Sequence, residues 1–134
     1  MATVTVTLFV NTGAISNQSN VDANSSFGQP QNITNENFTI NPNTLDNIIW
    51  QGFSSSAPST DAVNITSIVY EGAYNVFGSN QPNGNKQNPE KVLGTVANHT
   101  NGETEVYKIF FTVSNNGVLK NQQFHIDPII QVKP

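Results

Sequence analysis

The sequence predicts an all-β protein: a single antiparallel β-sandwich, Ig-like or jelly-roll-like, of about seven or eight strands. Apolar and polar residues alternate with a period of two in most apolar segments, and β-branched residues dominate the apolar positions. No apolar stripe of useful length repeats every 3.6 residues. We expect one β-sandwich domain over residues 1–134, because the chain has the length of one domain.

The first strand is the clearest, since Ala2, Val4, Val6, Leu8 and Val10 alternate with three threonines and a phenylalanine. A polar stretch then runs to about residue 32, and its length favours a functional or packing loop. Further strands are expected at residues 33–40, 46–53, 62–70, 74–77, 91–97, 103–114 and 122–132. Residues 78–90 are rich in Gly, Pro and Asn, which predicts an exposed loop.

The last two strands are expected to form an antiparallel hairpin. Asn116 and Gly117 lie between two apolar runs, and both residue types tolerate the positive φ of a tight turn. Phe124 should contact the core. Pro128 lacks an amide hydrogen and predicts an edge or bulge that shifts the register, where Asp127 would accept a backbone hydrogen bond.

Two core predictions complete the fold. In the 103–114 strand one face should be buried, and it carries Tyr107, Ile109, Phe111 and Val113. Trp50 is the only tryptophan and follows two isoleucines, so we expect it to be buried or half-buried in a strand.

The composition excludes several function classes. With no cysteine, the chain has no disulfide, no thiolate zinc site and no cysteine nucleophile. A net charge of −4 and five basic residues, all lysine and unclustered, argue against nucleic-acid binding. The 21 asparagines indicate a neutral amide surface, which favours ordered self-association or hydrogen bonding to polyols. The N-terminus does not read as a signal peptide, and no apolar run is long enough to predict a membrane span.

No residue pattern predicts an enzyme, a metal site or a cofactor. Only His99 and His125 offer an imidazole, and no nucleophile elbow surrounds a serine. No spacing singles out a pair of carboxylates. Asp22 lies in a segment with a few oxygen ligands for calcium, but the calcium-loop motif is missing. We interpret His125 and Asp127 as structural residues at a corner of the fold and not as a catalytic pair.

Saccharide binding is the small-ligand activity that fits the chain best, because sugars are held by amide and carboxylate hydrogen bonds beside an aromatic ring. Loop residues supply these groups. The candidate ligand-binding residues are Asp61, Asn64, Tyr74, Asn75 and Asn80.

Three segments, DNIIWQGF, NITSIVYEGAYNVFG and FHIDPIIQV, follow one another in an order that resembles a known family. The matching residues are Asp46, Ile48 and Trp50, then Tyr70, Gly72, Val76 and Phe77, and finally Phe124, Asp127 and Pro128. In these the chain resembles the bacterial inclusion body protein family typified by PixA and AidA. The resemblance implies an all-β protein without known catalytic residues that accumulates in the cytoplasm, sometimes as crystalline inclusions, and that is associated with host interaction.

Three hypotheses follow. The first is a non-enzymatic, self-associating protein of the inclusion body type, cytoplasmic and partnered by further copies of itself. The second is a lectin-like, carbohydrate-binding module with glycans as partners. The third is a β-rich subunit of an extracellular fibre, in which the strand at residues 1–10 of one copy fills an unpaired edge of its neighbour.

Overall fold

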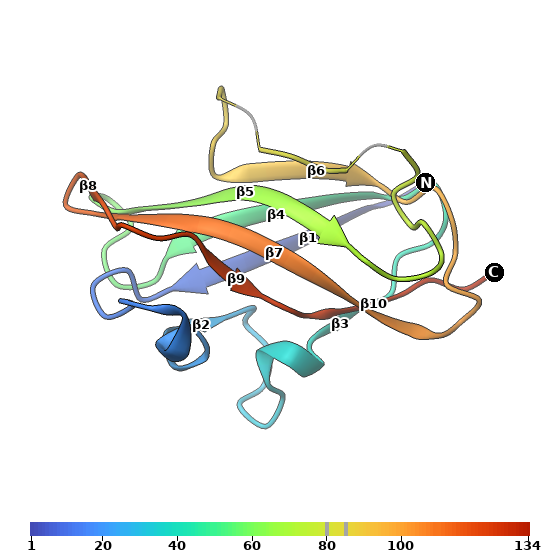
Figure 1. Ribbon diagram of the computed structural model, residues 1–134, viewed down its shortest axis with the longest axis horizontal. Coiled ribbons are helices and arrows are strands. Elements are labelled where there is room, and N and C mark those ends of the chain that lie inside the picture. The colour runs from blue at the N-terminus through green and yellow to red at the C-terminus, as the bar shows by residue number, and fades with distance from the viewer. Residues whose placement is uncertain (80, 85) are drawn as a thin grey trace.

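The computed structural model describes residues 1–79, 81–84 and 86–134, and its fold is all-β as predicted. Two sheets run along the long axis of the molecule (Figure 1). Three 3-10 helices of three residues each lie between strands: η1 at Gln18–Asn20, η2 at Asp22–Asn24 and η3 at Asn35–Asn37. Within the described ranges, no helix has the length and apolar character that crossing a membrane requires.

The four-stranded sheet has the order β2 (Ser25–Ser26), β1 (Thr3–Val10), β4 (Asn47–Ser54) and β6 (Lys91–Thr95). β1 and β4 are parallel and paired over their whole length, from Thr3 opposite Asn47 to Val10 opposite Ser54. The predicted alternation in β1 is confirmed, because every second residue from Val6 onwards is buried.

The six-stranded sheet is built around β7 (Thr104–Asn115), the longest strand. Its order is β3 (Thr39–Ile40), β10 (Ile129–Gln131), β7 and β5 (Ala62–Tyr70), while β8 (Val118–Leu119) and β9 (Phe124–Ile126) also pair with β7. β5 is antiparallel to β7, and a bulge lies between Ile65 and Ser67.

The prediction of a wholly antiparallel sandwich is wrong in two places. β1 pairs in parallel with β4, and β3 pairs in parallel with β10, so both sheets are mixed. Ten strands are formed by the described residues, more than predicted, because several are only two or three residues long. An Ig-like or jelly-roll-like order of strands stays a prediction.

Two predicted strands are wrong in detail. In the segment 33–40 only Thr39–Ile40 is a strand, because η3 occupies residues 35–37. Residues 74–77 form a turn and not a strand, because Asn75 has φ +51° and Gly78 has φ +65°, and positive φ angles are incompatible with extended backbone. The strands predicted at 46–53, 62–70, 91–97 and 103–114 are confirmed to within two residues at each end.

The C-terminal hairpin is confirmed, but its register after Phe124 differs from the prediction. Asn116 (φ +52°) and Gly117 (φ +78°) make the turn, and β8, β9 and β10 all return antiparallel to β7. The predicted register shift at Pro128 is wrong: Phe124 faces Phe111 and Ile129 faces Val106, which is one continuous register. Pro128 lies opposite Tyr107 and keeps the ladder through its carbonyl, which accepts from the Tyr107 amide at 3.1 Å.

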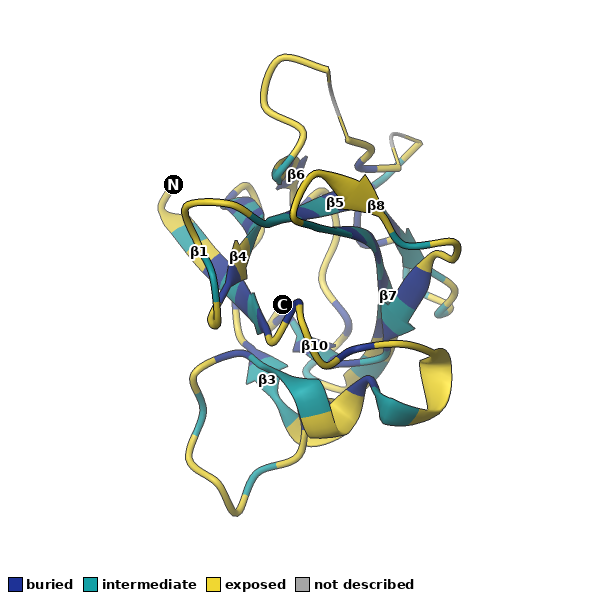
Figure 2. Ribbon diagram, turned by 90° about the vertical axis from the view of Figure 1, so that its left-hand side faces the viewer, coloured by how far each residue is buried: buried dark blue, intermediate teal, exposed yellow. Residues whose placement is uncertain are grey.

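The core lies between the sheets, where buried positions line the inner faces of the strands (Figure 2). Trp50 of β4 is 1% exposed, so the core prediction for it is confirmed. Its indole Nε1 donates a 3.3 Å hydrogen bond to the hydroxyl of Tyr107 on β7, which links the two sheets. Phe77 from the 74–77 turn packs edge-on against the same indole, with ring centroids 5.7 Å apart. The predicted core face of β7 is also buried as expected.

Candidate functional site

Asp61, first of the residues predicted to bind a saccharide, is occupied by internal hydrogen bonds. Its carboxylate accepts from the Thr12 hydroxyl at 2.5 Å, the Asn115 side-chain amide at 2.7 Å and the Asn116 backbone amide at 2.9 Å. The Asn116 amide and then the Thr12 hydroxyl lower the pKa of Asp61 to about 2. Asp61 therefore ties the start of β5 to the end of β1 and to the β7–β8 turn.

Tyr74 and Asn75 lie beyond the other end of β5. The Tyr74 hydroxyl donates to the Glu103 carboxylate, and this hydrogen bond, together with burial and the negative charge, raises the pKa of Tyr74. The Asn75 carbonyl accepts from the Asn98 side-chain amide at 2.7 Å. These two residues hold the 71–79 turn against the 98–103 segment.

The predicted saccharide residues are not brought together. Asp61 precedes β5 and Tyr74 follows it, and a strand of nine residues spans about 30 Å. Asn64 lies within β5 opposite Thr112 and lines a separate open hollow of about 300 Å³. Asn80 lies outside the described residues. These residues do not form one binding site, and sugar binding by any single one of them stays a prediction.

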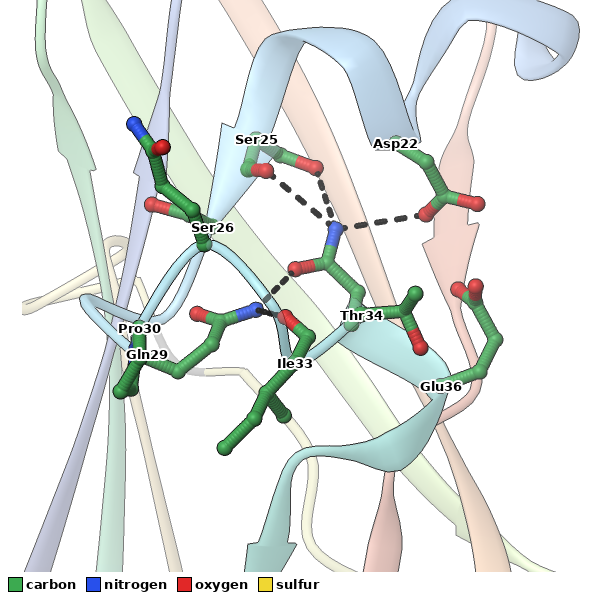
Figure 3. A pocket seen from close by; sticks show the side chains of 10 residues that line it. Asp22, Ser25, Ser26, Gln29, Pro30, Ile33, Thr34 and Glu36 are labelled. Atoms are coloured by element: carbon green, nitrogen blue, oxygen red, sulfur yellow. Dashed lines mark hydrogen bonds between the residues drawn. The ribbon is translucent and has the colours of Figure 1, made fainter.

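A larger cavity lies where the predicted polar loop meets the start of the strand predicted at residues 33–40. It measures about 530 Å³ and is lined by ten residues between Asp22 and Glu36, contributed by η2, β2, η3 and the turn between them (Figure 3). This volume is within the usual range for small-ligand pockets. The loop length was the one signal for it, because no motif or spacing singles out its residues.

Two amide side chains fix the shape of this cavity. Asn35 is 4% exposed, and its Nδ2 donates to Ser25 Oγ at 3.1 Å and to Asp22 Oδ1 at 3.3 Å. Gln29 Nε2 donates to Asn35 Oδ1 at 2.9 Å, while Gln29 Oε1 accepts from the Phe27 amide at 2.6 Å. These hydrogen bonds, drawn as dashed lines in Figure 3, hold the chain on both sides of the cavity in one arrangement.

One wall of the cavity is acidic. Burial, a hydrogen bond with the Asp22 carboxyl and the charge of that carboxyl raise the pKa of Glu36, with a smaller contribution from the charge of Asp127. Figure 3 shows the Asp22 and Glu36 carboxyls pointing into the same space. Among the ten residues that line the cavity none is basic.

His125 and Asp127 form a pair at the surface of β9. Their side chains are 3.1 Å apart, Nδ1 to Oδ1, and each is about one third exposed, at 34% and 37%. The His125 ring also packs against Phe110, with centroids 5.6 Å apart. The predicted backbone hydrogen bond to Asp127 is not found among the described residues, because the carboxylate turns towards the imidazole instead.

The described residues show neither a nucleophile paired with a histidine nor a cluster of metal ligands. No serine, threonine or lysine side chain in the described ranges is hydrogen-bonded to either histidine ring; His99 Nδ1 accepts from the Asn101 amide at 3.0 Å. Nor do three or more His, Cys, Asp or Glu side chains come together there in a way that could hold a metal ion.

Most of β1 is unpaired on one side among the described residues. β2 pairs only with Phe9 and Val10 of β1, so that no described strand pairs with Thr3–Leu8 on the side away from β4. We call these six residues the open edge of β1. They contain threonine, valine and leucine but no charge and no proline. The opposite edge of the sheet, β6, carries Lys91.

The outward surface of the same sheet is almost uncharged. Its neighbouring side chains are joined by hydrogen bonds, 2.9 Å from Gln51 to Thr7 and 2.8 Å from Thr95 to Asn47. Leu93 on β6 is 62% exposed and lies opposite Ile49. An uncharged surface next to an unpaired strand edge is typical of a place where sheets associate.

Comparison with solved structures places this fold beside a known one. No family model matches the sequence, and no curated protein matches it. The fold is similar to that of a PixA inclusion body protein from Burkholderia cenocepacia J2315, with a TM-score of 0.59 and 12% sequence identity. That likeness covers 98% of this chain and 94% of the other. The resemblance predicted from the sequence is confirmed at the level of the fold.

Proposed function

We propose that the chain is a non-enzymatic, self-associating protein of the inclusion body type, which accumulates in the cytoplasm. The observation that carries the proposal is the likeness in fold, over nearly the whole of both chains, to a protein described as an inclusion body protein. The partner in this proposal is a further copy of the same chain.

The open edge of β1 supplies a physical route to association. Unpaired backbone amides and carbonyls on a strand edge can pair with a second strand, and proteins that remain monomeric guard such edges with lysine, proline or bulges. The open edge has none of these guards. Two copies related by a two-fold axis can therefore pair β1 with β1 and join their four-stranded sheets.

Low charge supports the same proposal. Only 10% of residues are charged, and the net charge is −4, so two copies repel each other weakly. On the outward surface of β1, β4 and β6, Lys91 is the one charged side chain among residues 3–10, 47–54 and 91–95. Close approach of two such surfaces desolvates few charges.

The test replaces Thr5, in the middle of the open edge, with lysine. In a two-fold pairing whose axis passes beside Thr5 the two new charges face each other, which costs about 1 kcal/mol and corresponds to about five-fold weaker association. Sedimentation velocity over a concentration series measures association, and microscopy of expressing cells reports ordered bodies. Thr104→Lys is the matched control, since Thr104 is also an exposed threonine on a strand but lies on β7 of the other sheet.

We expect Thr5→Lys to weaken assembly and Thr104→Lys to leave it nearly unchanged. If both variants lost association equally, the proposed role of the open edge would be wrong. A wild-type protein that stays strictly monomeric at high concentration, with no ordered bodies in cells, would overturn the proposal itself.

The fibre hypothesis has less support. Residues 1–10 contain β1, which lies inside its own sheet between β2 and β4. A copy that donated this strand to a neighbour would first have to break its eight-residue pairing with β4.

A further inference from the structure

We propose that the cavity between Asp22 and Glu36 is a saccharide site, which binds a sugar through a pair of neighbouring hydroxyl groups. The proposal is independent of self-association, and it moves the expected carbohydrate contact from the loops around β5 to the 22–36 segment. Four features of the cavity support it.

The first feature is the presence of unused hydrogen-bonding groups. Ser26, Gln31 and Thr34 line the cavity, and their side chains have no hydrogen-bond partner in the part of the chain that the structure describes. Two hydroxyls and an amide offer both donors and acceptors, which is the combination that a sugar ring with several hydroxyls requires.

The second feature is the pair of carboxyls on the acidic wall. Asp22 and Glu36 both line the cavity, and Figure 3 shows their carboxyls pointing into the same space. Burial and then the neighbouring Asp22 carboxyl raise the pKa of Glu36, and the ionised forms of the two groups repel each other. A neutral ligand with two hydroxyl groups can donate one hydrogen bond to each carboxylate. Adjacent hydroxyls on a sugar ring have the spacing for such a two-point contact, and hydrogen bonds to ionised acceptors are the stronger kind.

The third feature is preorganisation. Asn35 is buried and uses its amide hydrogens within the loop, and Gln29 bridges the Phe27 amide to Asn35. A cavity already held in shape loses little conformational entropy when a ligand enters.

The fourth feature is an apolar strip beside the polar groups. Pro30 and Ile33 line the same cavity. Carbon–hydrogen faces of a sugar ring can pack there while the hydroxyls reach the carboxyls, which gives a ligand with one apolar and one polar side a definite orientation.

Saturation-transfer difference NMR tests the proposal, because it observes the sugar protons and works whether the protein is monomeric or assembled. The probes are D-mannose, D-galactose and L-fucose, each titrated singly into the wild-type protein, first with EDTA and then with calcium. We expect at least one of the three to give saturable transfer in EDTA.

Glu36→Ala is the diagnostic variant, and Glu71→Ala is its control. Both positions are exposed acidic residues, so both variants lose the same charge, but Glu71 lies outside this cavity. Loss of a hydrogen bond to a charged group should weaken binding about ten-fold or more in Glu36→Ala and leave Glu71→Ala as the wild type. An unchanged amide NMR spectrum away from residues 22–36 shows that the variant is folded.

Three outcomes would overturn the proposal. Absence of transfer to all three sugars in EDTA is one. Equal weakening in both variants is the second, since it would place the contact elsewhere. Transfer that appears only with calcium is the third, because the cavity would then be a cation site.

Discussion

Replacing Tyr107 with phenylalanine should destabilise the fold through a single buried hydrogen bond. The Tyr107 hydroxyl accepts from Trp50 Nε1 at 3.3 Å, and both side chains are 1% exposed. Burial raises the pKa of Tyr107, so the group stays neutral and the acceptor is a phenol oxygen. Without the Tyr107 hydroxyl oxygen, the indole N–H of Trp50 is buried with no hydrogen-bond acceptor.

The magnitude follows from that unsatisfied donor. A buried polar group without a partner costs about 1 to 3 kcal/mol. Part of this is recovered, because the hydroxyl hydrogen of Tyr107 has no acceptor among the described residues and its removal relieves a second unmet group. We expect a loss of about 1 to 2 kcal/mol in the free energy of unfolding.

Urea unfolding followed by tryptophan fluorescence is the assay. Trp50 is the only tryptophan, so the signal reports on the site itself. Tyr74→Phe is the control, because it also removes a tyrosine hydroxyl, but one at the surface, where water replaces the lost hydrogen bond. It should change the urea midpoint of unfolding far less. Should Tyr107→Phe match the wild type or exceed it in stability, the inference that this bond satisfies the buried indole would be refuted.

Three further predictions concern packing and pH. Gly52→Ala would place a Cβ 2.3 Å from the Val63 carbonyl oxygen and should cost about 1 to 3 kcal/mol in the free energy of unfolding, measured by thermal or urea unfolding. Gly13→Ala is the control and should be tolerated, because its Cβ would lie 3.8 Å from Asn11 Oδ1, an ordinary contact distance. The pKa of Asp61 is lowered from 3.8 to about 2, so its contribution to stability is complete above pH 3.8 and is lost as pH falls towards 2. In Asp61→Asn the free energy of unfolding should therefore change less with pH between 3.8 and 2. The pKa of Glu36 is raised from 4.5, so wild-type stability should fall as pH rises through the raised value, and a Glu36→Gln variant that kept this slope would contradict the assignment.

Local signals in the sequence predicted the parts of the fold that local chemistry decides. The alternation in β1 shows which residues face inwards, and Asn116 with Gly117 supplies the φ angles of the hairpin turn. Trp50 follows apolar neighbours and is buried. In each case the deciding interaction lies within a few residues of the signal.

Pairing between distant strands was not predictable in the same way. Nothing within β1 or β4 distinguishes a parallel neighbour from an antiparallel one, because the same alternation suits both. The short 3-10 helix at Asn35–Asn37 competes with a strand that the pattern around it favours equally. At Pro128 the expected shift failed because the Tyr107 amide meets a carbonyl there and the ladder continues.

The candidate cavity could not be predicted from the sequence, because it too depends on contacts between separate segments. Asp22, Asn35 and Glu36 are ordinary loop residues in an asparagine-rich chain, and the cavity exists only because η2 and η3 fold back towards each other. Conversely, Asp61 and Tyr74 had the right chemistry for a sugar but lie at opposite ends of β5.

The parallel pairing of β1 and β4 has a consequence during synthesis. Thr3 is opposite Asn47, so the first strand leaves the ribosome 44 residues ahead of its partner. At ordinary elongation rates this delay lasts about 2 to 9 s. During that time an uncharged, alternating β segment waits unpaired beside neighbouring nascent chains. Translation speed over the first 50 residues should therefore influence how much of the protein reaches its own fold before it meets another copy.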